Sequence, residues 1–112
     1  MLRDYKVYLE DILEAIRKAR NYTEDLSHEK FPQGGKTKDA VVRNLEVIGE
    51  AARKISEDIR SAHPEVEWRK IIGLRDIMIH EYFPVDFEVI WDVLQNKLPI
   101  LESQMERILS ES

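Results

Sequence analysis

Three residues that could do chemistry, Arg75, Asp76 and His80, lie within six positions of one another. Histidine is the side chain best suited to proton transfer near neutral pH, and a carboxylate beside it raises its pKa. Asp76 and His80 are four residues apart, so on a helix their side chains can meet on one face. Arg75 is five residues from His80 and needs its long side chain to bring the guanidinium to the same spot. The segment is therefore a candidate acid–base site beside a fixed positive charge.

These residues belong to a helix predicted from about Trp68 to Tyr82, which Phe83-Pro84 should end. At about 100° per residue, apolar side chains cover most of its circumference. The remaining narrow polar strip contains Arg69, Gly73, Asp76 and His80. A helix that is apolar nearly all round is normally buried, so this strip should face a crevice or internal hydrogen-bond partners. The spacing alone leaves both a catalytic site and a structural Arg–Asp–His network open.

The rest of the chain predicts an all-α protein, because apolar residues recur at helical spacing almost throughout. We expect helices at about 3–27, from Thr37 as N-cap to about 62, and from Asp86 as N-cap to about 97, followed by a fifth segment with Pro99 in its first turn. The segment 28–35 is the clearest internal loop. Short connections favour antiparallel neighbours, so residues 1–112 should form one up-and-down bundle of four or five helices.

Two apolar stripes should form much of the core. They comprise Tyr5, Leu9, Ile12, Ile16, Ala19 and Leu26 in the first helix, and Val41, Leu45, Ile48, Ala52, Ile55, Ile59 and Ala62 in the second. The opposite face of the second helix carries Arg43, Glu46, Glu50 and Arg53, which we interpret as a solvated ion-pair face.

Composition narrows the class of protein. The formal net charge is -5, and residues 77–112 carry 2 basic and 7 acidic side chains, which argues against a general nucleic-acid coat protein. The chain has no cysteine, so disulfides and thiolate metal sites are excluded. The N-terminus leads into no apolar run of signal or membrane-spanning length, so we expect a soluble cytoplasmic protein without a membrane association.

The run from Trp68 to Phe83 resembles the signature of HepT-like HEPN proteins. That family's motif is an arginine, a polar residue, three variable positions and a histidine, followed in the HepT branch by one residue and a tyrosine. Arg75, Asp76, His80 and Tyr82 match it position by position. The segment 36–51 also resembles the family's second helix, so the similarity covers nearly the whole chain.

The resemblance implies a HEPN-like fold and a metal-independent endoribonuclease without cofactor, the toxin of a toxin-antitoxin module. Its partners would be RNA and a nucleotidyltransferase antitoxin of the MNT type. His80 would act as general base or acid, Arg75 would hold the phosphate, and Asp76 would position one of them. A homodimer would bring two motifs together.

Tyr82 would receive AMP from the antitoxin, because the family's matching tyrosine does. It is seven residues from Arg75, within about 20° on the helix, so an attached phosphate would lie beside Arg75 and His80. The alternative is a non-catalytic module that binds nucleotides or docks a partner. The simplest interpretation of Arg75, Asp76 and His80 is a buried network in a helical scaffold.

Overall fold

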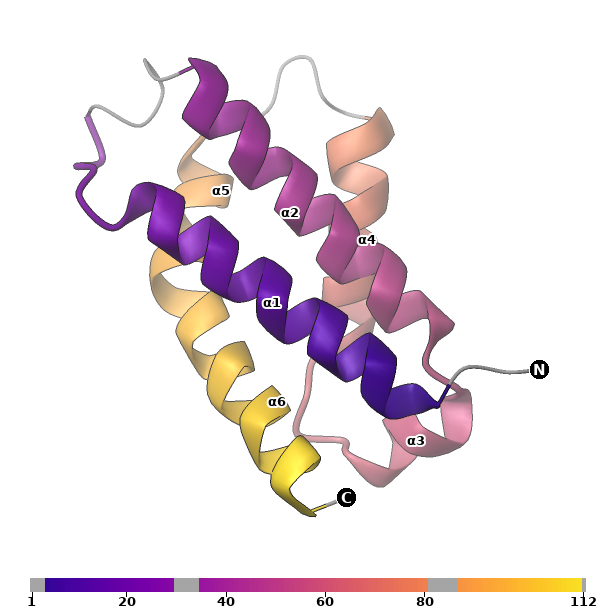
Figure 1. Cartoon of the computed structure of the whole chain (residues 1–112). Helices are drawn as coiled ribbons and strands as arrows, with labels where there is room; N and C mark the ends of the chain where they lie inside the picture. The colour runs from indigo at the N-terminus through magenta and orange to yellow at the C-terminus, as the bar shows by residue number, and fades with distance from the viewer. Residues whose placement is uncertain (1–3, 30–34, 81–86, 112) are drawn as a thin grey trace.

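The computed structural model describes residues 4–29, 35–80 and 87–111, and the side chains of 76–80 and 87 lie outside this description. The described part of the chain is all-α (Figure 1). Its long helices are α1 (Tyr5–Thr23), α2 (Gly35–Lys54), α4 (Trp68–His80) and α6 (Leu98–Glu111), with the shorter α3 (Glu57–Ala62) and α5 (Phe87–Asp92) between them. The predicted all-α, HEPN-like bundle is confirmed.

The long helices run alternately up and down (Figure 1). Helix α1 packs against α2 on one side and α6 on the other, and α2 packs against α4. Arg17 and Arg20 on α1 form ion pairs with Glu102 on α6. Helix α4 therefore lies at the edge of the bundle, next to α2.

The core lies mainly between α1, α2 and α6, where the predicted stripes are buried. Its fully buried large side chains are Leu9, Ile12, Ile16, Leu45, Ile48, Ile55, Ile90, Leu98, Met105 and Ile108. Among the predicted stripe residues, Tyr5, Leu26 and Ile59 are only half-buried, and Ala62 is exposed. The two stripes were thus correct along most of α1 and α2 and failed toward their ends.

Helix α1 ends at Thr23 rather than at the predicted Ser27. The buried Thr23 hydroxyl donates to the carbonyls of Ala19 and Arg20, and the Glu24 amide donates to the Asn21 carbonyl in a tighter turn. A hydroxyl that competes for backbone carbonyls disfavours continuation of the helix. At the other end, the Asp4 carboxylate caps the helix by accepting from the Lys6 amide.

The second predicted helix is in fact two. Ser56 has an extended backbone, with φ -62° and ψ 154°, and its hydroxyl caps α3 by accepting from the Ile59 amide. The apolar spacing continues across this break, which is why the sequence predicted one helix. Thr37 is the third residue of α2 rather than its cap, because α2 begins at Gly35.

The start of α4 is held by the segment before it. The Trp68 indole donates to the His63 carbonyl at 3.0 Å, and Trp68 itself is buried. Gln104 and Arg107 on α6 bind the backbone carbonyl and the carboxylate of Glu65. These contacts fix where α4 leaves the loop, and so where its later residues lie.

The last two predicted helices are joined without a loop. Between α5 and α6 the chain forms a π-helical segment, Val93–Lys97, in which the Leu98 amide donates to the Val93 carbonyl. Pro99 lies in the first turn of α6, as predicted. It has no amide hydrogen, and its ring would clash with the carbonyl four residues earlier in a regular helix, so the wider turn accommodates it. The expected Asp86 cap lies outside the described residues.

None of the described helices is both long and apolar enough to cross a membrane.

Candidate active site

The structure places the backbone of Arg75, Asp76 and His80 on α4, as predicted. Of these three side chains, only that of Arg75 is described. The side chains of Asp76 and His80, and all of Tyr82, lie outside the described residues. The site can therefore be built from Arg75 and from the part of the bundle that holds it.

Helix α4 crosses α2 at Gly49, where the two backbones approach closely. A Cβ atom at residue 49 would lie 2.8 Å from the Arg75 backbone nitrogen, 2.9 Å from the Arg75 Cβ and 3.1 Å from the Ile71 carbonyl oxygen. Any side chain larger than hydrogen would force these backbones apart. Gly49 thus sets the position of Arg75 relative to α2.

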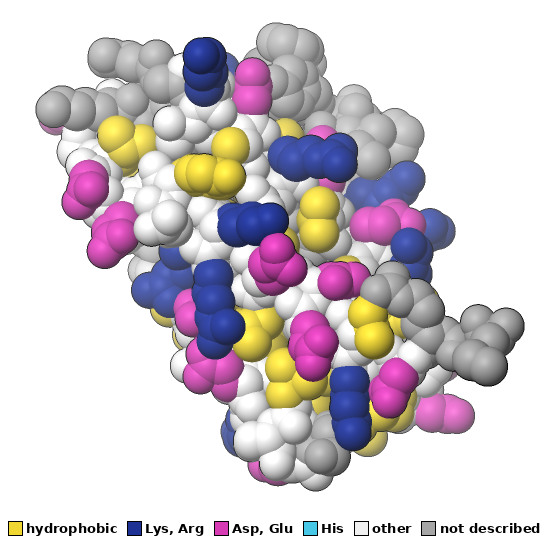
Figure 2. All heavy atoms as spheres, in the orientation of Figure 1, with side chains coloured by type: hydrophobic (Ala, Val, Ile, Leu, Met, Phe, Trp, Pro, Cys, Tyr) yellow, Lys and Arg dark blue, Asp and Glu magenta, His cyan; other side chains and the backbone are white. Residues whose placement is uncertain are grey.

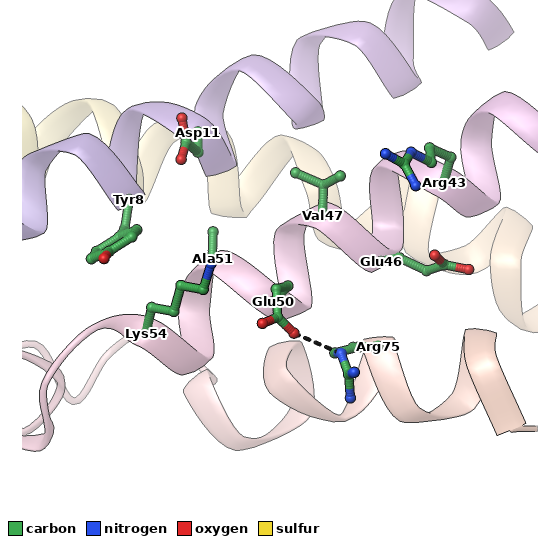
Figure 3. Close-up of a pocket in the computed structure, with 9 residues that line it drawn as sticks. All are labelled: Tyr8, Asp11, Arg43, Glu46, Val47, Glu50, Ala51, Lys54 and Arg75. Carbon is green, nitrogen blue, oxygen red and sulfur yellow. Dashed lines mark ion pairs between the residues drawn. The ribbon is translucent and has the colours of Figure 1, made fainter. Parts of the chain in front are cut away.

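The neighbouring residue on α2 binds the Arg75 side chain. The Nε atom of Arg75 lies 2.6 Å from Oε2 of Glu50, and each side chain is 33% exposed (Figure 3). The other carboxylate oxygen, Oε1, accepts from Nη2 of Arg53 at 3.1 Å. The Oε2 atom is buried and accepts no well-aligned hydrogen bond from the described residues, so the Arg75 ion pair is what balances its charge.

These contacts keep Glu50 ionised. The hydrogen bond from Arg53 lowers the pKa of Glu50 below its ordinary value of 4.5, and the positive charges of Arg53, Arg75 and Lys54 lower it further against an opposing effect of burial. Near neutral pH, Arg75 therefore faces a negative charge on α2.

A pocket of about 330 Å³ lies on this side of the bundle (Figure 3). Helices α1, α2 and α4 all contribute to it. Its lining residues are Tyr8, Asp11, Arg43, Glu46, Val47, Glu50, Ala51, Lys54 and Arg75. In Figure 3 the Arg75 guanidinium extends from Nε, beside Glu50, with its terminal nitrogens directed away from the carboxylate.

Basic and acidic side chains alternate around the pocket. Three of its residues are basic and three are acidic. The same interleaving is visible over α1 and α2 in Figure 2. Such a surface suits a ligand held at one or two charged points more than a long polyanion held along its whole backbone.

Sequence reasoning missed the contribution of α2. The predicted ion-pair face is real, because Glu50 pairs with Arg53, but Arg43, Glu46 and Glu50 also line the pocket that contains Arg75. The one available signal was a glycine, Gly49, directly before Glu50 inside a strong helical pattern. The contribution of Tyr8 had no signal, since its half-buried ring fits the core stripe of α1 equally well.

The expectation that α4 is buried nearly all round holds for only part of its described surface. Trp68 and Ile71 are buried, whereas Ile72 and Leu74 are half-buried. Gly73 faces open space, since a Cβ there would meet nothing within 4 Å. A single chain thus leaves this side of α4 partly uncovered.

Among the side chains that the structure describes, no group of three or more histidine, aspartate or glutamate residues is placed to hold a metal ion.

Comparison with known proteins identifies the family. The sequence model of the family described as Ribonuclease HepT-like matches residues 12–108. The chain is 42% identical over 108 residues to "Probable ribonuclease HepT" of Thermococcus cleftensis, covering 96% of this chain and 98% of that protein. It is 38% identical over 109 residues to "Putative RNase MJ0127" of Methanocaldococcus jannaschii, covering 97% of this chain and 90% of that protein.

A second protein of that organism, "Putative RNase MJ1216", is 39% identical over 109 residues, with the same two coverages. No solved structure matches the chain. The all-α bundle and these matches together show that the chain belongs to the HepT-like ribonuclease family.

Proposed function

We propose that this protein is a metal-independent endoribonuclease that cleaves RNA through Arg75, Asp76 and His80, and that it is the toxin of a toxin-antitoxin pair. The observation that carries the proposal is the position of Arg75. The Arg75 side chain is one-third exposed and lines a pocket, and it belongs to the same helix as His80. Two relatives that the chain matches over nearly their full length are named as a probable ribonuclease and a putative RNase, and these names support the same activity.

RNA can be cut without a metal because its own 2'-hydroxyl is the nucleophile. The protein then has to remove the proton from that hydroxyl and give a proton to the leaving 5'-oxygen. His80 is the general base or acid. Arg75 binds the scissile phosphate and stabilises the charge that develops on its oxygens. Asp76 positions His80 or Arg75.

The pocket beside Arg75 suits a nucleotide next to the scissile phosphate. Lys54 and Arg43 on α2 supply two further positive charges, and the half-buried ring of Tyr8 on α1 provides a surface on which a base can stack. The three acidic residues of the pocket limit its net charge. Binding should therefore depend on a few local contacts rather than on a general attraction to RNA.

A homodimer would complete the site. One chain offers one His80, whereas the reaction benefits from both a base and an acid. The uncovered side of α4, with Gly73 open and Ile72 and Leu74 half-buried, supports the approach of a second copy there. A twofold axis near this helix would bring two motifs together.

The proposed antitoxin is a nucleotidyltransferase of the MNT type that attaches AMP to Tyr82. The support is positional. Tyr82 is two residues after His80 in the sequence, and His80 belongs to the helix that carries Arg75. A nucleotide attached there would bring negative phosphate to the positive charge that RNA needs.

The test of the activity is cleavage of RNA in EDTA by purified protein. We expect cleavage by the wild type and none by His80→Ala or Arg75→Ala proteins whose circular dichroism is unchanged. Wild-type-like cleavage by His80→Ala would contradict the assignment of the catalytic histidine. RNA binding without cleavage by the wild type would instead identify a non-catalytic binding module.

A further inference from the structure

The motif on α4 does not include Glu50, which forms an ion pair with Arg75 from the neighbouring helix α2. We infer that Glu50 is a positioning residue, which fixes the Arg75 guanidinium through Nε so that the terminal nitrogens are directed at the phosphate. That Glu50 positions Arg75 for catalysis rests on the proposed function. The contact between Glu50 and Arg75 itself depends only on the structure of α2 and α4.

The first support is the geometry of the contact. Arginine has a long side chain with many rotamers, and holding it in one orientation costs conformational entropy. The ion pair between the Glu50 carboxylate and Nε, 2.6 Å apart, favours the orientations in which Nε faces α2. The two terminal nitrogens extend the other way (Figure 3), in the arrangement that binds two phosphate oxygens at once.

The second support is the rigidity of the carboxylate itself. Arg53, one turn along α2, holds Oε1 at 3.1 Å, so the Glu50 carboxylate is fixed from its own helix before it meets Arg75. Gly49 brings the backbone of α4 into contact with α2 directly beside it. The carboxylate and the arginine are thus positioned by two independent sets of contacts.

The third support is a comparison between two glutamates of α2, Glu50 and Glu46. Glu46 lies one turn earlier on α2 and lines the same pocket, so it contributes the same charge at a similar place. The ion pair with Arg75 is formed by Glu50. A general effect of negative charge in the pocket would act through both glutamates, whereas positioning acts through Glu50.

The first arm of the test is structural and needs no activity. In ¹⁵N-labelled protein at pH 6, where guanidinium protons exchange slowly with water, the order parameter of Arg75 Nε should be high in the wild type and in Glu46→Ala, with the signal assigned by its loss in Arg75→Lys. It should fall in Glu50→Ala and in Glu50→Gln, because both changes remove the negative charge of the ion pair. An unchanged order parameter in Glu50→Ala would overturn the inference.

The second arm is kinetic. We expect Glu50→Ala to lower kcat for RNA cleavage by about tenfold to a hundredfold, since misplacement of a binding group by about 1 Å has effects of this order. KM should stay equal or fall, because a negative charge has been removed near RNA. Glu50→Gln should lower kcat similarly, because the amide carries no charge. Glu46→Ala removes the same charge from the pocket and should change KM in the same direction without this loss of kcat.

The two arms separate the inference from the proposed function. A kcat for Glu50→Ala equal to or above that of the wild type would show that Glu50 does not position Arg75 for catalysis. If the wild type cut no RNA in EDTA, the proposed ribonuclease activity would fail, and the order parameter of Arg75 Nε would still decide whether Glu50 fixes Arg75.

Discussion

The backbone nitrogen of Arg75 would lie 2.8 Å from a Cβ atom at Gly49, closer than two such atoms can approach. The position of the candidate catalytic arginine therefore depends on the absence of a side chain on the neighbouring helix.

This contact predicts opposite effects of alanine at Gly49 on α2 and at Gly73 on α4. Gly49→Ala should destabilise the protein by about 1 to 3 kcal/mol, because the added methyl group meets backbone atoms that cannot move independently. Gly73→Ala should be neutral or stabilise the single chain by up to about 1 kcal/mol, because its methyl group meets no atom of the same chain and alanine favours the helix. Denaturant unfolding measures both. Equal effects of the two changes would mean that the α2–α4 crossing is looser than described.

A second prediction concerns the pocket. Lys54→Gln should raise KM for RNA several-fold and reduce the salt dependence of binding by about 0.7 in the slope of log K against log salt, the value for one phosphate contact on a single strand. Lys18→Gln is the control, because Lys18 pairs with Glu14 on α1 instead of lining this pocket. Identical salt slopes for the two variants would remove Lys54 from the RNA site.

The pH dependence of stability gives a third prediction. The pKa of Glu50 is lowered in the folded protein, first by the Arg53 hydrogen bond, so its stabilising effect is complete above about pH 4.5 and is lost as the pH falls through the lowered folded value. Glu50→Gln should therefore flatten the fall in unfolding free energy below pH 4.5. Denaturant titrations between pH 7 and pH 3 check this. If the fall in unfolding free energy below pH 4.5 were unchanged in Glu50→Gln, other carboxylates would be responsible for that fall.

Assembly gives a fourth prediction. Sedimentation velocity at micromolar concentration should show a homodimer, because one chain leaves Ile72, Leu74 and Gly73 on α4 incompletely covered. Replacement of Gly73 by tryptophan should favour the monomer and abolish cleavage while α4 stays helical. A stable monomer that cuts RNA at the wild-type rate would refute a site shared between two chains.

Regulation by the antitoxin gives the fifth prediction. Coexpression with an MNT-type nucleotidyltransferase should add one or more AMP units at Tyr82 and remove RNA cleavage, because the added phosphate competes with RNA for Arg75 and His80. Intact-mass and peptide mass spectrometry detect the change. If Tyr82→Phe protein were controlled equally well by a catalytically active partner, inhibition by docking would replace modification.

The spacing of apolar residues predicted the helices that form the core, because the buried side chains of a helix recur every three or four residues. Leu9, Ile12 and Ile16 on α1 and Leu45 and Ile48 on α2 are all fully buried. Where backbone polar groups decide, the pattern gave no guidance. The Ser56 hydroxyl caps α3 at a break that lies within an unbroken apolar stripe.

The candidate site was likewise predictable only in part from the sequence. Arg75 and its helix could be predicted, because motif and helical spacing are both local in sequence. The part played by Glu50 could not, because it depends on which residues of α2 face α4, and that follows from the close approach at Gly49. The roles of His80 and Tyr82 remain predictions that the variants above test, and the role of Asp76 also stays a prediction.

The π-helical segment Val93–Lys97 also bears on how the length of the chain can vary. A π-turn is a regular helix with one residue added, so the helices before and after it keep the directions they would have without that residue. Pro99→Ala alone should leave the wide turn in place, because tightening it would rotate α6 by about 100° and turn Met105 and Ile108 out of the core. A deletion of one residue between 93 and 97, combined with Pro99→Ala, would instead restore a regular helix with both core faces aligned. Within the helix from α5 to α6, this segment is therefore where a natural deletion of a single residue is best tolerated.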